Sequence, residues 1–455
     1  MKLTRYEQEM LDGKHGPAKH FAMEKLVDFG KAVGAEEMVP VTFVLHGCPI
    51  YAPNRKDPKV AEKLAIYDLG HSPLFDDIFK FKDAHVADQS GCACGNDPYL
   101  LQLDKYEEKG YPWNFEIPGK GGFKMDKEIV EWYQKGYDKL AEHGWLNWLS
   151  CNPYFNTRIP KMGEYASCCE SSAAAYINTI LGARTNRENT ITSLYAAYTG
   201  CLPKYGSHLD ENRVAKCIVE LDDEVRDPMK DAADWAALGA VIADKAQNRI
   251  MAVLNLPKVL SPTATKQLIS CCSPGMNDPI MHLIGITPES PTLEAAFKGK
   301  MPKNPERYKV TMTDIVDMYG YLNKIAPATG EKDVDIVIMG CPHLTFEEVR
   351  EIARLVKGKK LKEGVCLWIQ TDTPSYWMAH QYGDTKIIEE AGGKIFHQTC
   401  TAMIPMRYYP KNLTIATDSF KFVKLGGGFG NNWIFGTVPD LINAATTGRF
   451  ISTRW

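Results

Sequence analysis

Polar side chains that could do chemistry follow four short apolar runs in the last third of the chain. They are Cys341 and His343 after the first run, Asp372 after the second, Cys400 after the third, and Ser419 with Lys421 after the fourth. In a parallel sheet, residues just past the carboxyl ends of the strands share one edge, where ligands bind. The order of the runs therefore predicts that these thiols, the imidazole, the hydroxyl and the amine converge.

Cys341 has a second feature that favours reactivity. Thr345-Phe-Glu-Glu348 is a capping-box pattern, so a helix N-terminus is expected just beyond Cys341 and would stabilise a thiolate. A free cysteine is more often a small buried hydrophobic residue, and either Cys341 or Cys400 alone would be interpreted so. Because both cysteines are expected on one edge of the sheet, a metal-binding role for Cys341 and Cys400 is as credible as a role as inert buried residues.

A third soft ligand would make this an iron–sulfur site, since thiolates hold such clusters. Cys151 is the preferred candidate because Asn-Pro-Tyr follows it, a loop signal that exposes the side chain. Cys92 and Cys94 are the alternative, because neighbouring glycines make their loop flexible and a CxC pair can chelate. No CxxC occurs, which disfavours thioredoxin-like redox chemistry and the usual zinc-ribbon spacing.

A second polar group follows the helical run Ser171–Leu181. Arg184, Asn186 and Arg187 come directly after it. Two arginines on a solvated helix end are one explanation, because the last carbonyls of a helix favour cations. Recognition of a carboxylate or phosphate by the paired guanidinium groups is the other. His208 lies in a charged loop soon afterwards and could serve acid–base chemistry or support a neighbouring group.

The alternation of strand-like and helical runs predicts an α/β fold. In the last third, short apolar runs alternate with helical patterns, which is typical of a doubly wound, mostly parallel sheet. The apolar runs are Val334–Met339, Val365–Ile369, Lys394–Phe396, Leu413–Ala416 and Trp433–Phe435, and the helical patterns are Phe346–Val356, Trp377–Glu390 and Asp440–Ala445. We expect an N-terminal region at 1–213 with an irregular insertion at about 53–122, a central region at 214–330 and a C-terminal domain at 331–455.

The composition excludes several classes of protein. With 53 Lys and Arg against 56 Asp and Glu, the formal net charge is −3, so the chain is not expected to bind nucleic acid through bulk charge. Thirteen scattered cysteines, with no signal peptide and no apolar run of membrane-spanning length, predict a reducing cytoplasm and no membrane association. Gly426-Gly-Gly-Phe-Gly430 is weak evidence for a nucleotide, because it lacks the P-loop pattern.

Several long polar motifs occur in the order found in aconitase X proteins, and the chain is identified as resembling that family. The motifs are Cys151-Asn-Pro-Tyr154, Pro160-Lys-Met-Gly-Glu164, Glu170-Ser-Ser-Ala173, Asn178 to Glu188, Tyr205 to Arg213, Gly285-Ile-Thr-Pro-Glu289, Gly340-Cys-Pro-His-Leu344 and Thr399-Cys400. The resemblance covers most of the chain and is weakest between about 53 and 122. It implies an iron–sulfur or iron-dependent hydro-lyase that removes water from a small hydroxy acid.

The resemblance also implies roles for individual residues. Cys151, Cys341 and Cys400 would hold a cluster, 4Fe-4S being favoured over 2Fe-2S or a single iron. The catalytic residues would be His46, His208, Ser419 and Lys421, and the substrate-binding residues Glu170, Ser171, Arg184, Asn186, Arg187 and His343. A substrate with a phosphate group would need more cationic side chains than the few available, so cis-3-hydroxy-L-proline is the favoured substrate and mevalonate 5-phosphate the alternative. A binding or scaffold protein that kept the fold without activity is a third hypothesis.

The chain departs from the family pattern at several positions. Gln398 stands where Asp is common, Asp418 where Asn is common, and Asn189-Thr190 where a glycine-rich continuation is usual. The small swivel domain of the family has no counterpart in the sequence, which predicts a separate small subunit.

Overall fold

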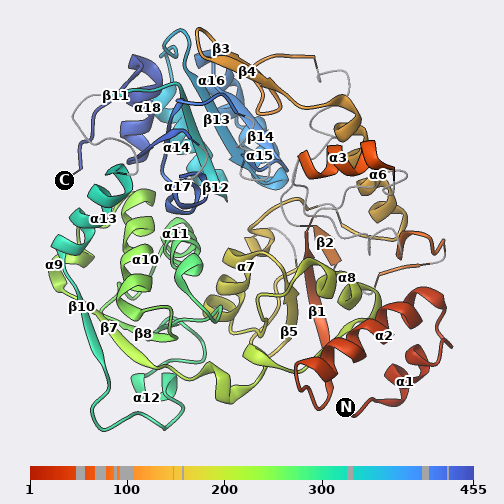
Figure 1. Cartoon of the computed structure of the whole chain (residues 1–455). Helices are drawn as coiled ribbons and strands as arrows, with labels where there is room; N and C mark the ends of the chain where they lie inside the picture. The colour runs from red at the N-terminus through yellow and green to blue at the C-terminus, as the bar shows by residue number, and fades with distance from the viewer. Residues whose placement is uncertain are drawn as a thin grey trace.

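The computed structural model describes residues 1–47, 57–66, 78–82, 84–86, 90–92, 107–146, 148–155, 158–324, 332–401, 409–427 and 430–454. In this part of the chain no helix is both long and apolar enough to cross a membrane. Figure 1 shows a C-terminal part above, a central part at the lower left and an N-terminal part at the lower right.

The C-terminal part is built on a five-stranded parallel sheet of order β14-β13-β12-β15-β16. Its strands are β12 (Ile336–Leu344), β13 (Cys366–Thr371), β14 (Lys394–His397), β15 (Thr414–Thr417) and β16 (Asn432–Phe435). β12 lies in the middle of the sheet. From it the chain adds β13 and then β14 on one side, and β15 and then β16 on the other. The strand order therefore reverses between β12 and β15, which confirms the predicted doubly wound sheet.

Helices connect and cover these strands. They are α14 (Phe346–Val356), α15 (Thr373–Gln381), α16 (Asp384–Ala391), α17 (Phe420–Gly426) and α18 (Val438–Thr447), and the short pair β11 (Lys332–Asp333) and β17 (Arg449–Phe450) joins the ends of this part. The helix predicted at Trp377–Glu390 is two helices, because Gly383 adopts a left-handed conformation with φ +80° between them. Gly426 packs against Trp433, whose ring leaves no room for a Cβ, so packing accounts for this glycine.

The central part is a parallel sheet of order β10-β7-β8-β9 covered by helices. Its elements are β7 (Cys217–Leu221), α9 (Asp223–Arg226), α10 (Ala232–Ala246), β8 (Met251–Leu254), α11 (Pro262–Cys272), β9 (His282–Leu283), α12 (Leu293–Ala296), β10 (Arg307–Val310) and α13 (Met312–Lys324). Asp231 begins α10 with a capping box and Ser261 caps α11, so both helices start at side chains that satisfy free N–H groups. The helical runs that the sequence predicts at Ala232–Ala246, Thr263–Ser270 and Thr313–Ile325 correspond to α10, α11 and α13 to within two residues at each end.

The N-terminal part contains a sheet in which β1 pairs in parallel with β2 and β5 and antiparallel with β6. Its elements are α1 (Arg5–Leu11), α2 (Pro17–Ala32), β1 (Met38–His46), α3 (Pro58–Ile66), β2 (Ser90–Cys92), β3 (Asn114–Ile117), β4 (Gly121–Lys124), α6 (Lys127–Glu142), β5 (Tyr165–Cys168), α7 (Ser171–Tyr176), α8 (Thr190–Thr199) and β6 (Cys201–Pro203). The helix predicted at Ser171–Leu181 changes to a π turn at Ile177–Leu181 and ends at left-handed Gly182. Most of the predicted insertion at 53–122 lies outside the described residues.

The hairpin of β3 and β4 was not predicted, and it carries the N-terminal part onto the C-terminal sheet (Figure 1). Lys120 at its turn forms an ion pair of 2.7 Å with Asp335, and Phe115 packs edge-on against Trp368 with 5.1 Å between ring centroids. A single cluster of buried apolar side chains runs through all three parts. The N-terminal, central and C-terminal parts therefore fold as one packed body.

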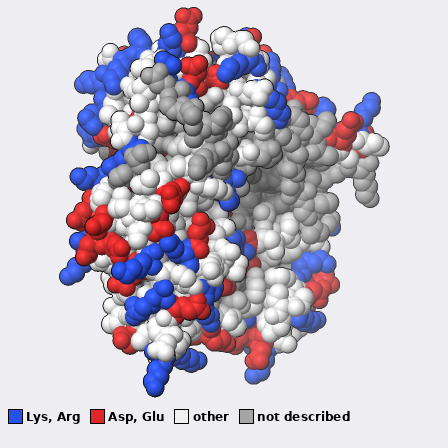
Figure 2. Space-filling view, turned by 60° about the vertical axis from the view of Figure 1, so that its left-hand side comes forward, with Lys and Arg blue, Asp and Glu red and all other residues white. Residues whose placement is uncertain are grey.

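The outer surface agrees with the near-neutral charge. Figure 2 shows basic and acidic side chains interspersed over one face of the molecule.

Candidate active site

Cys341 lies at the point where the strand order of the C-terminal sheet reverses. It belongs to the carboxyl end of β12, and Ser419 follows the neighbouring strand β15. Ser419 caps α17 by accepting the N–H of Phe422 at 3.2 Å, and its side chain lowers the pKa of the Cys341 thiol. In doubly wound sheets this crevice is where ligands bind.

The backbone before Cys341 requires a glycine. Gly340 has a φ of +111°, and a Cβ there would lie 2.2 Å from the carbonyl oxygen of Gln370 on the adjacent strand. A side chain would push β12 away from β13. Gly340 thus lets Cys341 turn out of the strand while the sheet stays paired.

Three sulfur atoms interact at this site. Burial raises the pKa of the Cys341 thiol well above its usual value, and the Cys400 and Cys151 groups raise it further, whereas Lys421 and Ser419 lower it. Cys400 follows β14 and is buried, and Cys151 is buried in the loop before the turn Pro153–Phe155. The structure therefore brings together the three cysteines predicted as ligands.

Three cysteine side chains are the donor type that iron–sulfur clusters use. Burial favours the protonated thiols, so a bound metal would have to displace their protons and supply the compensating positive charge. Among the described residues, no group of three or more His, Cys, Asp or Glu side chains is arranged around one metal ion. Cysteine ligands of a cluster bind different iron atoms, so they need not surround one point.

Lys421 brings a positive charge next to the cysteines. Its ammonium group contacts Glu170 at 2.5 Å, the Ser171 hydroxyl at 3.2 Å and the Ser172 hydroxyl at 2.9 Å. Burial lowers the pKa of Lys421, but the Glu170 carboxylate and the Cys341 group outweigh burial and raise it. Lys421 therefore stays charged and joins α17 to the N-terminus of α7, more than 200 residues away in the chain.

Breaking this ion pair is expected to destabilise the protein. Lys421→Met leaves the Glu170 carboxylate nearly buried without its cation, and removing one partner of such a pair costs about 3–5 kcal/mol. We expect the midpoint of urea denaturation to fall accordingly. Lys424→Met on the exposed side of the same helix is the control, and Glu170→Gln combined with Lys421→Met should recover part of the loss. Equal stability of the Lys421→Met and Lys424→Met variants would contradict this prediction.

His343 is fully buried, and its ring lies beside two polar groups of the protein. Its ring Nε2 lies 2.8 Å from the carbonyl oxygen of Thr399, and its Nδ1 lies 3.4 Å from the hydroxyl of Ser150. Burial lowers the pKa of this imidazole to about 4, so the ring is neutral. These contacts favour a role in positioning, although binding of substrate by His343 stays a prediction.

Two buried polar residues of this site were missed in the sequence. Lys266 of α11 donates to the carbonyl oxygen of His343 at 2.9 Å and forms an ion pair with Glu348. Asn152 donates to the same carbonyl oxygen at 2.8 Å. A lysine in the middle of an otherwise buried helical run was the available signal for Lys266.

Arg184 and Asn186 belong to a second polar cluster. Arg184 forms an ion pair of 2.7 Å with Asp210 and donates to the carbonyl oxygen of His208 at 2.9 Å. Asn186 donates to the Glu188 carboxylate and to the carbonyl oxygen of Tyr205, and accepts the N–H of Ser207 at 2.6 Å. Both side chains are engaged in holding the segment from Tyr205 onward, so their predicted contact with substrate stays a prediction.

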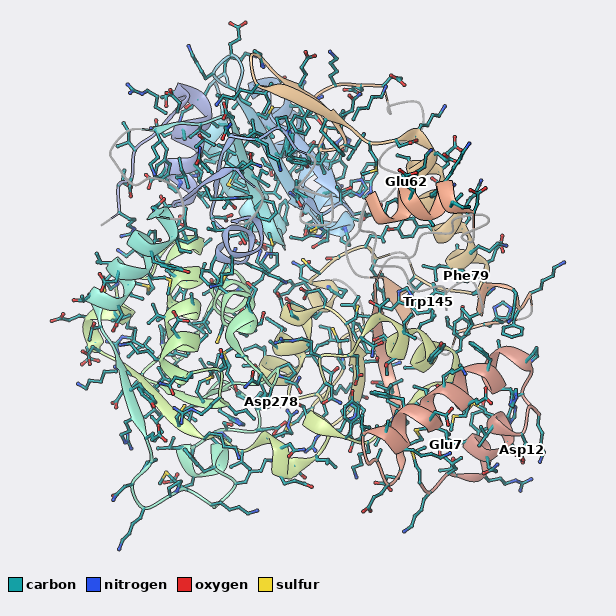
Figure 3. The ribbon with its side chains drawn as sticks, viewed as in Figure 1. Glu7, Asp12, Glu62, Phe79, Trp145 and Asp278 are labelled. Carbon is teal, nitrogen blue, oxygen red and sulfur yellow. The ribbon has the colours of Figure 1, made fainter. Side chains whose placement is uncertain are left out.

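Arg187 lies between this cluster and the cysteine site. It donates to the carbonyl oxygens of Ser273 and Met276, while burial lowers its pKa and the carboxylates of Glu170 and Asp278 raise it. Figure 3 shows Asp278 between the central sheet and the N-terminal part. Of the predicted pair of arginines, Arg187 is therefore the one that comes near Glu170.

The two histidines predicted as catalytic are both buried. His208 belongs to the cluster of Arg184; its ring lies 3.2 Å from the carbonyl oxygen of Pro203, and burial lowers its pKa to about 4. His46 ends β1 and packs against the ring of Trp145, with 4.4 Å between ring centroids. Their catalytic roles stay predictions. The side chains of Cys92 and Cys94, the alternative ligands, lie outside the described residues.

Comparison with known proteins identifies the family of the chain. Sequence profiles of the aconitase X first, second and third domains match residues 1–70 with 113–211, 215–320 and 334–447. The chain belongs to the aconitase X family. The phosphomevalonate dehydratase large subunits of Methanocaldococcus jannaschii and Thermococcus kodakarensis are each 30% identical to it, over 97% and 98% of this chain and 99% and 100% of those subunits.

Other relatives have a different name or a solved structure. The cis-3-hydroxy-L-proline dehydratase of Hypocrea jecorina is 26% identical over 99% of this chain and 69% of that enzyme. The crystal structure of Thermococcus kodakaraensis aconitase X in its holo form has a TM-score of 0.75 and 28% identity, covering 98% of this chain and 100% of that one. The predicted family, the α/β fold and the hydro-lyase class of this aconitase X chain are thereby confirmed.

Proposed function

We propose that this chain is the large, catalytic subunit of an iron–sulfur dehydratase that removes water from a small hydroxy acid. The observation that carries the proposal is the group of buried polar side chains at the strand-order reversal, where the Cys341 thiol and the Lys421 ammonium group affect each other's pKa and Lys421 contacts Glu170. The chemistry needs a Lewis acid beside a charged group that can hold a carboxylate. This arrangement supports both on one side of the sheet.

Cys151, Cys341 and Cys400 would hold the cluster. When bound, incompletely ligated iron acts as a Lewis acid on the hydroxyl group that leaves. Lys421, held by Glu170 and the two hydroxyls of α7, keeps a fixed positive charge beside the sulfurs. These three contacts use all the donors of the ammonium group, so a substrate carboxylate would have to replace one of them. Ser419, at the start of α17, lowers the pKa of the Cys341 thiol, and we propose that the small subunit contributes to proton removal.

The first candidate substrate is cis-3-hydroxy-L-proline. Arg184 is paired with Asp210, and Arg187 is used by backbone carbonyl groups, so these cations are already engaged in the protein. A phosphate-bearing substrate would require additional cations. Mevalonate 5-phosphate is the second candidate, because the relatives named for it match this chain over nearly their whole length.

A separate small subunit is part of the proposal. Several relatives that match end to end are named large subunits, whereas the hydroxyproline dehydratases are longer than this chain. We therefore expect the small subunit to complete the site, and we place the assembled enzyme in the cytoplasm.

The test is water elimination by the assembled enzyme. The chain is co-expressed with the candidate small subunit, purified without oxygen and incubated with each of the two acids. We expect dehydration of cis-3-hydroxy-L-proline, measured by mass spectrometry, and little turnover by the large chain alone. Turnover of mevalonate 5-phosphate instead would replace the first substrate with the second. Full activity of the chain by itself would contradict the need for a small subunit.

A further inference from the structure

His343 contacts every segment that carries one of the three cysteines. It lies two residues after Cys341 on β12, and its backbone N–H donates to the sulfur of Cys151 at 3.2 Å. Its ring Nε2 lies 2.8 Å from the carbonyl oxygen of Thr399, the residue before Cys400. One residue thus connects three loops that are far apart in the sequence.

The main chain of His343 is also fixed from two directions. Its carbonyl oxygen accepts from Nδ2 of Asn152 at 2.8 Å and from the ammonium group of Lys266 at 2.9 Å. Asn152 adjoins Cys151, and Lys266 is held in turn by Glu348 at the start of α14. These bonds leave the histidine little freedom to move relative to the first ligand.

The ring has one defined donor. A carbonyl oxygen can only accept, so Nε2 carries the hydrogen of the bond to Thr399. The hydroxyl of Ser150 lies 2.5 Å from Oδ1 of Asn152 and 3.4 Å from Nδ1 of His343, so its single hydrogen goes to Asn152. The bond from Nε2 to Thr399 is therefore the interaction through which the side chain positions the Cys400 segment.

We propose that His343 is a positioning residue that fixes the spacing of Cys151, Cys341 and Cys400 and thereby retains the cluster. The inference rests on the proposed function, because it concerns the group that these cysteines would hold. Groups that orient metal ligands typically change metal affinity by about 10–100-fold when they are replaced. The effect is expected in the retention of iron, before any effect on catalysis.

Two substitutions separate the ring bond from general packing. In His343→Gln the amide nitrogen reaches the place of Nε2 and keeps a donor toward Thr399, whereas the shorter side chain of His343→Asn does not reach it. His282→Asn is the matched control. His282 is equally buried and its Nε2 bonds to the carbonyl oxygen of Arg213 at 2.7 Å, outside the cysteine segments. Asn152→Ala tests the main-chain contact by itself.

The measurement is the rate at which anaerobically purified protein loses iron to a chelator, followed by visible absorption, iron analysis and circular dichroism. We expect loss about tenfold faster or more in His343→Asn, near the wild-type rate in His343→Gln and His282→Asn, and intermediate in Asn152→Ala. Equal retention by wild type, His343→Asn and Asn152→Ala would overturn the positioning role and leave the proposed function standing. Equal losses in His343→Asn and His282→Asn would also overturn it. A wild-type chain without iron and sulfide would instead refute the proposed function.

Discussion

Anaerobically purified Cys341→Ser protein is expected to be colourless and to contain little iron or acid-labile sulfide. Cys341 interacts with the two other sulfur groups and with Ser419 and Lys421, so its loss removes the centre of the proposed cluster site. A serine oxygen is a harder and less acidic ligand than a cysteine sulfur, and iron–sulfur clusters are held by thiolates. Cys151→Ser and Cys400→Ser are expected to lose the colour as well.

A buried cysteine outside the site serves as the control. Cys201 is buried against Met23, with 3.9 Å between the two sulfur atoms. Cys201→Ser places the same polar atom in an apolar environment, so it reports the cost of the substitution without the loss of a ligand. It should keep the visible spectrum and the iron content of the wild type. The ligand set would be wrong if Cys92→Ser lost the colour while Cys341→Ser kept it.

The C-terminal sheet was predictable because the hydrophobic pattern and the helix-capping pattern of the sequence indicated the same elements. Short apolar runs alternated with amphipathic helices, and a capping box marked the start of α14 at Phe346, where the structure begins it. Once the strands were assigned, the sharing of one edge by Cys341, Cys400 and Ser419 followed from the parallel arrangement. Cys151 was chosen by a loop signal and by the family resemblance, and its contact with His343 depends on packing between distant segments.

Other features depended on contacts that no local pattern reports. The hairpin of β3 and β4 packs on Trp368 of a distant strand, so its stability comes from tertiary contacts rather than from its own short sequence. The sequence left two explanations for the arginines after Gly182, a solvated helix end and an anion site, whereas in the structure Asp210 and two backbone carbonyls of the central part engage them. Sequence spacing shows which cations are neighbours, and only the fold shows which of them are already paired.

Asp418→Asn is expected to stabilise the protein near pH 8 and to have much less effect near pH 4.5. Asp418 is 1% exposed, and neither carboxylate oxygen has a hydrogen-bond partner in the described structure. Its pKa is raised from 3.8 to about 7, mainly by burial and also by the Glu348 and Asp231 carboxylates, although Lys266 lowers it. Asparagine has nearly the same shape and carries no charge at any pH.

The direction of this pH dependence follows from the difference between the pKa of Asp418 in the folded state and in the unfolded state. In the folded state the carboxyl group keeps its proton up to about pH 7, whereas in the unfolded chain it ionises above about pH 4. Rising pH therefore favours the unfolded state between these values, and the cost of Asp418 is complete above pH 7. Its upper bound is roughly 4 kcal/mol, at about 1.4 kcal/mol for each unit of pKa.

The pH dependence can be measured as the difference in free energy of unfolding between wild type and Asp418→Asn in urea at pH 5 and pH 8. We expect a gain on the order of 2–4 kcal/mol at pH 8 that shrinks toward pH 5. Asp314→Asn is a control of opposite sign. Burial raises the pKa of Asp314, but hydrogen bonds from Lys245 and Thr311 lower it overall, so this carboxylate stabilises the fold above its unfolded pKa and loses that effect as pH falls. A gain from Asp418→Asn that is equal at both pH values would show that Asp418 is ionised in the folded protein throughout the range.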